Sequence, residues 1–461
     1  MKIELIIIGL IGLFFNYGLA QDRLSLSDAI RLGLDRNYDI RIEEKNVLTS
    51  ETNNNWGEAG LFPSLTASLQ GSTSVFDNKE ALNPFSIVAK TKTTSQIVPS
   101  LNLNWNLLGV KNISINKHKF ETLQKESEGN ADIVIANNIQ SIILGYYVVV
   151  LELRRLEEFK KQLELSRDKY HQIKLRKDMG SAVTSDLLLE EGNYLTDSAD
   201  YIIQERVFKN AQYSLNFLIG ETEINKGYIL TDDFIIDKEG PLTYEQLARK
   251  MDDDNIDLKK QYLSQAILND DVQLRRADRL PQLSIGANYT YTKNTQDISD
   301  WPIERLQIRD DNGNVIGMRS STGTNANANY GANFTVSFNL FNGGKINRAI
   351  QRTIILEDIG NIRIEKMKSS MNRDLLNAFE EYQVRKQLFE ISDLRYISAS
   401  QNLEITEHKF ENGSINSFDY RTVQNNHLMA AIQRLQSLYN LIDSKVTLMR
   451  LTGGIVATYR E

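Results

Sequence analysis

Residues with catalytic or metal-binding chemistry are few in this chain, and their spacing builds no recognisable site. The sequence contains no cysteine, which excludes thiolate metal sites, disulfides and cysteine nucleophiles. Its histidines lie far apart, and none belongs to an H-E-x-x-H ligand spacing; they are His118, His171, His408 and His427. We therefore expect no catalytic residue, no bound metal, no cofactor and no enzyme activity.

Two further segments carry residue types that bind phosphate or calcium in other proteins. Gly343-Gly344-Lys345 resembles the end of a phosphate-binding loop, but Asn339 stands where that motif needs its first glycine. Residues 310–314 are rich in Asp and Asn, but the glycine and the glutamate of a calcium loop are not in the required places. We interpret the first segment as a strand-to-helix turn and the second as the polar tip of a loop.

Four segments alternate apolar and polar residues: about 62–76, 96–108, 281–293 and 329–342. Successive side chains of a strand point to opposite faces, so each segment has one apolar face and one uncharged polar face. This combination is typical of a transmembrane β-barrel, whereas the wet face of a soluble sheet usually carries Lys and Glu. The polar side chains that we expect in the barrel lumen are Ser64, Thr66, Ser68, Asn102, Asn104, Asn288, Asn333 and Thr335.

Aromatic residues mark the two ends of the expected membrane-spanning strands. Trp105 and Phe338 stand where strands meet helices, so we expect them in the periplasmic aromatic belt. Tyr289 and Tyr291 are expected toward the opposite belt. Pro99 cannot donate a hydrogen bond within its strand, and it indicates either a bulge or weak pairing.

The N-terminus indicates that the protein leaves the cytoplasm. Residues 1–20 read as a signal peptide, with Lys2, an apolar run at 5–15 and small residues before a cleavage at Gln21. The run is shorter than the ~20 residues of a spanning helix, and we expect no other uncharged segment of that length. A net charge of −7 argues against a nucleic-acid partner. We expect a Gram-negative outer-membrane protein whose membrane elements are strands.

The mature chain contains one unit twice, over residues 21–238 and 239–461. Matching pairs include Phe62-Pro63 with Leu280-Pro281, Trp105-Asn106-Leu107 with Phe338-Asn339-Leu340, Gly180-Ser181 with Gly413-Ser414, and Asp186 with Asp419. The extra length of the second copy falls in residues 293–328, which we expect to form a long external loop. Its counterpart in the first copy is a shorter loop at 76–95.

Each copy ends in a long helical hairpin, at about 109–220 and 343–453. Apolar residues recur there with the 4-3 spacing of a coiled coil, interrupted in the first copy only by Lys160 and Arg167. Gly180 and Gly413 are expected to turn each helix back through a left-handed cap. At about 1.5 Å per residue these helices are too long for a bilayer of about 30 Å, so they must extend into the periplasm.

Four strands cannot close a barrel, and open edges in lipid leave backbone groups unpaired. Two copies of the chain would give a small barrel filled by side chains, whereas three would give about twelve strands and an open lumen. The polar faces favour three. We therefore expect an α+β membrane protein, a homotrimer with a twelve-stranded barrel continuous with a periplasmic helical barrel and surrounded by outer-membrane lipid.

This organisation resembles the TolC family of outer-membrane efflux proteins over residues 26–453. The resemblance rests on the duplicated unit, the prolines before the strands, the strand ends and the glycine turns described above. It implies a passive exit duct for efflux or type I secretion. Its partners would be a periplasmic adaptor (membrane fusion) protein and an inner-membrane pump of RND, ABC or MFS type. The alternatives are a free-standing porin and a periplasmic coiled-coil adaptor or structural protein.

The resemblance also implies roles for the hairpin turns. Asp186 and Asp419 stand where the family has inward carboxylates at the periplasmic aperture. The turns, with Gly180, Ser181, Gly413 and Ser414, would dock with the adaptor. Ile415 and Thr422 replace the Arg and second Asp of many members, so the closing network would be built differently. The alternative is that both aspartates are first-turn acids stabilised by the helix dipole.

Overall fold

The computed structural model describes residues 22–83, 86–108, 110–234, 242–298, 307–318 and 321–459, so the expected signal peptide lies outside the described residues. The chain divides into two compact units that alternate along the sequence. The helical unit consists of Met1–Thr49, Lys125–Ser264 and Asn361–Glu461. The sheet unit consists of Ser50–Gln124 and Gln265–Gly360.

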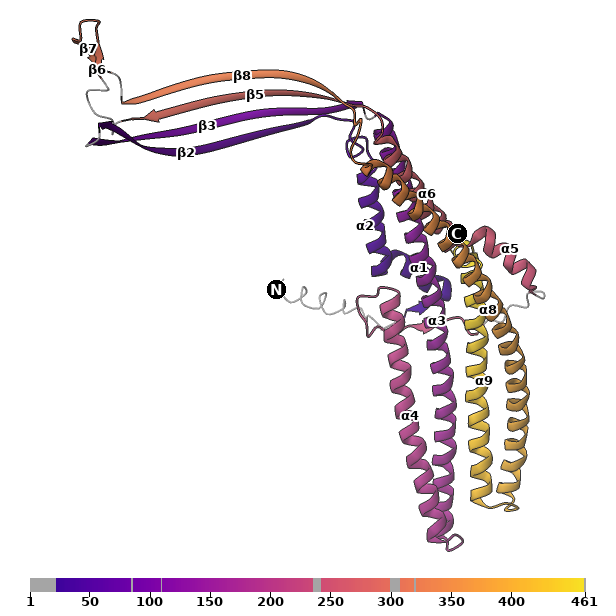
Figure 1. Cartoon of the computed structure of the whole chain (residues 1–461). Coiled ribbons are helices and arrows are strands. Elements are labelled where there is room, and N and C mark those ends of the chain that lie inside the picture. The colour runs from indigo at the N-terminus through magenta and orange to yellow at the C-terminus, as the bar shows by residue number, and fades with distance from the viewer. Residues whose placement is uncertain are drawn as a thin grey trace, which may run out of the picture. The chain divides into compact units, whose positions relative to one another are not determined.

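Corresponding elements follow one another in the same order in both halves of the chain (Figure 1). The first half contains β1 (Arg23–Leu24), α1 (Leu26–Arg36), α2 (Tyr38–Asn53), β2 (Ser64–Asn83), β3 (Ser86–Leu108), α3 (Val110–Asp178) and α4 (Thr184–Leu218). The second contains β4 (Ile229–Leu230), α5 (Tyr244–Asp254), α6 (Ile256–Ala277), β5 (Gln282–Asp297), β8 (Thr322–Ser337), α8 (Lys345–Glu411), α9 (Ser417–Leu451) and α10 (Gly454–Tyr459).

The sheet unit contains four antiparallel strands in the order β2-β3-β5-β8. In one row of the register Asn104 pairs with Ser64 and with Gly286, and Gly286 pairs with Asn333. The next row is apolar, with Leu103 at its centre. Because the rows alternate, all eight residues expected in the lumen lie on one face. Within the described residues β2 and β8 are open edges.

The strands run further from the helices than the sequence indicates. Residues 76–95 were expected as a loop, but the described residues 76–83 and 86–95 form the distal parts of β2 and β3, with the charged residues Asp77 and Lys92. Within residues 293–328, β5 continues to Asp297, β8 begins at Thr322, and β6 (Gln307–Arg309) pairs with β7 (Val315–Met318). These extensions contain apolar residues such as Phe76 and Val315, but without the regular apolar–polar alternation that reveals a strand. At its other end β8 stops at Ser337, just before Phe338.

Pro99 weakens strand pairing without a bulge. It pairs with Leu69 of β2, but the β3–β5 ladder has no paired residues between Ile97–Lys293 and Ser100–Thr290. The register is the same on both sides of this gap. The missing proline N–H accounts for it, because proline cannot donate to the ladder.

The helical unit has its main core around the middle of α3. Ile139, Ile142 and Tyr146 of this helix are fully buried. The Tyr146 hydroxyl donates to the carbonyl of Leu24 at 3.1 Å and accepts from the N–H of Asp232 at 3.1 Å. These bonds attach the parallel β1–β4 pair to the helix. Each large apolar side chain buried here contributes about 1.5–3 kcal/mol.

The length and composition of part of α3 would allow it to cross a membrane, contrary to the expectation from the sequence. Half of this stretch is buried within the protein. Its apolar side chains include the core residues Ile139, Ile142 and Tyr146. Among the described residues, the apolar character of α3 is therefore explained by the core of the helical unit.

An asparagine makes the same hydrogen bond to the end of a long hairpin in both halves of the helical unit. The side-chain amide of Asn37 donates to the carbonyl of Leu218 at 2.9 Å, and that of Asn255 donates to the carbonyl of Leu451 at 2.8 Å. Each asparagine oxygen also accepts from backbone N–H groups at the start of the following helix. The duplicated sequence therefore forms a duplicated tertiary contact between a short helix pair and the end of a long hairpin.

Candidate functional site at the hairpin tips

Both long hairpins turn through a glycine in the left-handed conformation. Gly180 has φ +76° and Gly413 has φ +67°. The N–H of Ser181 donates to the carbonyl of Arg176, and that of Ser414 to the carbonyl of Lys409, both at 2.8 Å. An added Cβ at either glycine would meet no atom within 4 Å. Backbone conformation alone therefore requires glycine, as in other helix ends with this hydrogen-bond pattern.

Asp186 and Asp419 lie in the first turns of α4 and α9, directly after these tips. The N–H of Asp419 donates to the side-chain oxygen of Asn416, which caps α9, at 2.8 Å. Asp419 is exposed and Asp186 is partly exposed. No ion pair involves either carboxylate within the part of the chain that the structure describes, and no contact joins the two. Both are thus placed to interact with solvent or with another chain.

A buried ion pair lies behind the tip of the first hairpin. Lys169 of α3 and Glu190 of α4 have side chains only 4% and 1% exposed, and Lys169 Nζ lies 3.1 Å from Glu190 Oε1. The Glu190 oxygen has no partner with hydrogen-bond geometry among the described residues, so the attraction is mainly between charges. Lys169 Nζ also donates to the carbonyl of Ser417 in α9 at 3.3 Å. Burial lowers the pKa of Lys169, while Glu190 opposes this shift.

A second buried pair joins α4 to α9. The guanidinium of Arg421 donates to both carboxylate oxygens of Asp197, at 2.7 and 2.6 Å. The side chain of Asp197 is 3% exposed and that of Arg421 is 15% exposed. Gln162 of α3 donates to the same carboxylate at 3.4 Å. This bidentate geometry is the strongest form of carboxylate recognition by a side chain, and it connects the two hairpins of one chain.

Aromatic rings complete this cluster. Phe410 and Tyr420 stack with their centroids 4.8 Å apart. Lys169 Nζ lies over both rings, at 4.7 and 4.8 Å from their centroids. Burial raises the pKa of Tyr420 to about 12, so its hydroxyl stays neutral. We call Lys169, Glu190, Asp197, Phe410, Tyr420 and Arg421 the tip cluster. It fastens α3 and α4 to α8 and α9 near their tips.

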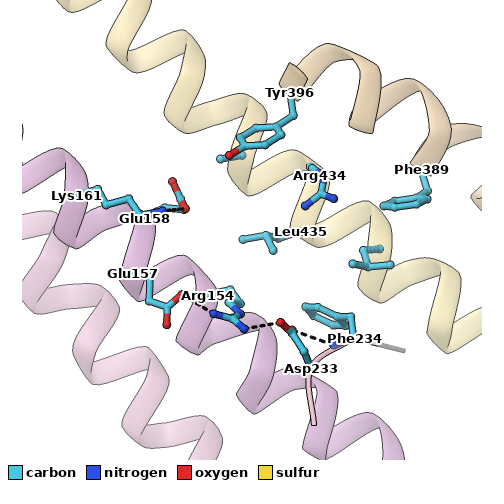
Figure 2. A pocket seen from close by; sticks show the side chains of 12 residues that line it. Arg154, Glu157, Glu158, Lys161, Asp233, Phe234, Phe389, Tyr396, Arg434 and Leu435 are labelled. Atoms are coloured by element: carbon cyan, nitrogen blue, oxygen red, sulfur yellow. Dashed lines mark hydrogen bonds and ion pairs between the residues drawn. The ribbon is translucent and has the colours of Figure 1, made fainter. Parts of the chain in front are cut away.

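A cavity of about 390 Å³ lies further along the hairpins (Figure 2). Phe389 and Tyr396 of α8 and Leu435 of α9 form apolar walls, and charged side chains of α3 form the opposite rim. The rim charges pair internally: Arg154 contacts Glu157 and Asp233, Lys161 contacts Glu158, and Arg434 contacts Asp393. No unpaired charge among these residues therefore points to a ligand.

The histidines and the loops that resemble binding motifs have structural surroundings. His118 contacts Asp270 at 2.9 Å, and His427 lies against the ring of Tyr396. Asp310 accepts from the N–H groups of Asn312 and Asn314 and so shapes the turn between β6 and β7. No group of three or more His, Asp or Glu side chains in the described ranges is arranged to hold a metal ion.

Comparison with known proteins agrees with this geometry. Residues 247–454 match the family model described as outer membrane efflux protein. This part of the chain is thereby shown to be an outer membrane efflux protein domain. Its outer-membrane location, expected from the strands, is thereby confirmed. No protein with a curated description matches the sequence.

Solved structures of outer-membrane channels have the same fold as this chain. The Campylobacter jejuni CmeC outer membrane channel has a TM-score of 0.64 at 18% identity, covering 93% of this chain and 85% of that chain. The open state of the Neisseria gonorrhoeae MtrE channel has a TM-score of 0.64 at 14% identity, covering 93% and 89%. The Vibrio cholerae outer membrane protein VceC has a TM-score of 0.63 at 12% identity, covering 93% and 96%.

The residues expected in the two aromatic belts lie in different rows of the sheet. Trp105 lies in the row of Ile285 near the helices, and its indole N–H donates to the carbonyl of Leu61 at 2.9 Å. Tyr289 pairs with Leu101, four residues further along β3, and Tyr291 lies two residues beyond Tyr289. Phe338 is exposed just past the end of β8. The belts remain a prediction, with the four residues separated along the strands as it requires.

Sequence reasoning missed the tip cluster because the residues that α3 and α4 contribute to it are polar. The expected apolar stripe of lower α3 contains Leu163, Arg167 and Tyr170, but the buried residues there are Gln162, Ser166 and Lys169, one position earlier. In α4, Glu190, Asp197 and Gln204 are buried at intervals of seven. The recurrence of these polar residues at every seventh position was the available signal. A search for apolar periodicity cannot detect it.

Proposed function

We propose that three copies of this chain form an exit duct across the outer membrane, fed by an inner-membrane pump through a periplasmic adaptor. The observation that carries this proposal is a four-stranded sheet whose two edges are open within the described residues. From the row of Trp105 to the row of Tyr291 it has one apolar face and one uncharged polar face. An open edge in hydrocarbon costs several kcal/mol for each unpaired backbone group. Three copies would pair every edge and leave a polar lumen.

The helical unit supports assembly independently, because the polarity of α4 is reversed up to Gln204. The buried residues of this part are Glu190, Asp197 and Gln204, whereas Leu188 and Leu195 are both 60% exposed. A monomeric soluble helix would bury the apolar face. In α8, Ile391 and Leu394 are likewise 62% and 65% exposed. These apolar faces need cover from another chain.

The order of the helices supports one arrangement of neighbouring copies. Contacts join α4 to α3 through Gln162, α3 to α9 through Arg155, and α9 to α8 through Arg434. Figure 1 shows α4 and α8 at opposite ends of this row. The exposed face of α4 would therefore pack on α8 of the next copy. Such a head-to-tail contact generates a closed ring when the rotation closes.

The mass and shape of the detergent-extracted protein test the assembly. We expect light scattering to give three chains per particle, each with a mass below the 52.6 kDa of the precursor. Negative-stain images should show a tubular extension from a micelle-bound end. A monomer, or a particle without the extension, would contradict the shared barrel and the duct.

The carboxylates of Asp186 and Asp419 are proposed to line the periplasmic aperture, six in a trimer. This placement is supported by the exposure of both side chains, partial for Asp186 and full for Asp419, and by the absence of ion pairs to either carboxylate among the described residues. The double variant Asp186→Asn/Asp419→Asn should reduce cation preference in planar bilayers, while Asp200→Asn, elsewhere on α4, should not. Unchanged selectivity in the double variant would leave both residues as acids stabilised by helix dipoles.

The turns at Ser181 and Ser414 are proposed to dock with the adaptor. Both serines are exposed, and each follows a glycine that is required by its left-handed backbone conformation and not by close packing. Because the chain has no native cysteine, Ser181→Cys and Ser414→Cys each introduce a unique thiol. They should form crosslinks to the adaptor in cells, whereas Thr196→Cys, exposed on α4 away from the tip, should not. Equal crosslinking at all three positions would contradict docking at the tips.

A further inference from the structure

The apolar face of the sheet becomes polar part-way along the strands. The row Leu69–Pro99–Tyr291–Ala328 is still apolar. The next row on this face is Gly71–Ile97–Lys293–Ala326. The two rows after it are Thr73–Ser95–Thr295–Thr324 and Val75–Thr93–Asp297–Thr322. The row Thr73–Ser95–Thr295–Thr324 thus carries hydroxyl groups on all four strands, and the row after it combines the hydroxyls of Thr93 and Thr322 with Val75 and Asp297.

The apolar part alone matches the thickness of a membrane. From Phe338 to Ala328, the partner of Tyr291, the chain advances ten residues. At about 3.3 Å per residue this is about 33 Å of strand, or about 25 Å of height at a tilt of about 40°. Outer-membrane barrels have an apolar band of about 25 Å. The strands therefore complete a membrane crossing near Tyr291.

A long part of the sheet remains beyond that level. β2 continues for twelve residues beyond Gly71, to Asn83, and is paired with β3 almost throughout. By the same geometry this adds about 30 Å of height. β5 and β8 accompany it as far as the row of Asp297 and Thr322. We call residues 71–83, 86–97, 293–297 and 322–326 the distal sheet.

The outward face of the distal sheet has a distinct chemistry. Hydroxyl groups contact one another across strands, with Thr73 Oγ1 at 3.2 Å from Ser95 Oγ and Thr295 Oγ1 at 3.4 Å from Thr324 Oγ1. Lys293 stands at the boundary with the apolar band, exposed and without an ion pair in the described part of the chain. Neutral donors and acceptors match sugar hydroxyls, and an ammonium group at this level matches phosphate.

We propose that the distal sheet stands outside the hydrocarbon and binds the phosphorylated sugar headgroups of outer-leaflet glycolipid. The hydroxyl face contacts the sugars, and Lys293 contacts their phosphate groups. This rests on the membrane orientation in the proposed function, with the helices on the periplasmic side. It goes beyond that function because a duct that ended at Tyr291 would already cross the membrane.

Spin labels at single cysteines test the placement. The absence of native cysteine allows Leu69→Cys, Thr73→Cys and Thr295→Cys to be labelled individually in the full trimer. In phosphatidylethanolamine–phosphatidylglycerol vesicles, the Leu69 label should collide with oxygen, and the two threonine labels with a water-soluble nickel chelate. Adding deep-rough lipopolysaccharide should reduce nickel collisions at the threonine positions several-fold. Threonine labels that behave like the Leu69 label would overturn the placement, and nickel collisions unchanged by lipopolysaccharide would overturn the headgroup contact.

Lys293→Gln tests phosphate recognition. Native mass spectrometry of the trimer should show a several-fold loss of preference for lipopolysaccharide over its dephosphorylated form. Lys92→Gln, on the opposite face of β3, should retain the preference. Equal preference in the wild type and Lys293→Gln would refute the phosphate contact. Conductance of the same trimers separates the headgroup proposal from the proposed duct. Normal conductance with lipid-exposed threonine labels would refute only the headgroup proposal. Loss of trimers would refute the duct.

Discussion

Removal of the Arg421 guanidinium should loosen the hairpin tips far more than removal of an exposed arginine. In Arg421→Met, Asp197 would stay buried at 3% exposure without its bidentate partner. Breaking a buried pair by removing one member typically costs about 3–5 kcal/mol. Since about 1.4 kcal/mol is a factor of ten, local opening of the tip should increase by at least about a hundredfold.

Hydrogen exchange of the intact trimer in detergent measures this opening. Amide exchange within residues 190–204 and 415–428 should accelerate in proportion to the open fraction. Arg385→Met is the matched control, because Arg385 forms an exposed pair with Glu381 one turn away on α8. Such i,i+4 pairs contribute about 0.3–0.5 kcal/mol, so the control should change exchange near Arg385 about twofold.

The double variant Asp197→Leu/Arg421→Met separates the pair from its surroundings. Replacing both members of a buried ion pair by apolar residues is often neutral or stabilising. Exchange at the tips should therefore return close to the wild-type rate. The reasoning is refuted if Arg421→Met accelerates exchange no more than Arg385→Met, or if the double variant opens as readily as the single variant.

Three other substitutions test separate parts of the structure. Gly220→Ala should destabilise the helical unit by at least about 1 kcal/mol, because φ is +70° and the new Cβ would lie 2.6 Å from the carbonyl oxygen of Arg36; a thermal melt that matches the wild type would contradict this. Leu195→Glu should abolish trimers in light scattering without unfolding the helices in circular dichroism, because Leu195 is exposed within one chain; intact trimers would place the subunit contact elsewhere. Burial lowers the pKa of His427 from 6.5, so the unfolded chain binds a proton more readily than the folded state, and the free energy of unfolding should fall as the pH drops below about 6.5. In pH-dependent melts His427→Gln should reduce this dependence of stability on pH. An unchanged dependence would exclude His427 as its source.

The sequence by itself determined which face each strand residue occupies. Side-chain direction in a strand alternates with every residue, so parity alone places Asn102, Asn288 and Asn333 on one face once the strands are recognised. The glycine turns were equally predictable, because Gly180 and Gly413 end long helices where a left-handed residue is needed. These features are local, and local rules were sufficient for them.

Strand length, register and the buried charges were decided only by the tertiary structure. Beyond the row of Lys293 the strands lose the regular apolar–polar alternation, and pairing between strands makes this part a sheet. Lys169, Glu190 and Asp197 are charged residues that a local rule assigns to the surface. Their burial follows from partners far away in the sequence, such as Arg421, which compensate the loss of water. Such compensation depends on which helices pack together, and no periodicity within a single helix encodes it.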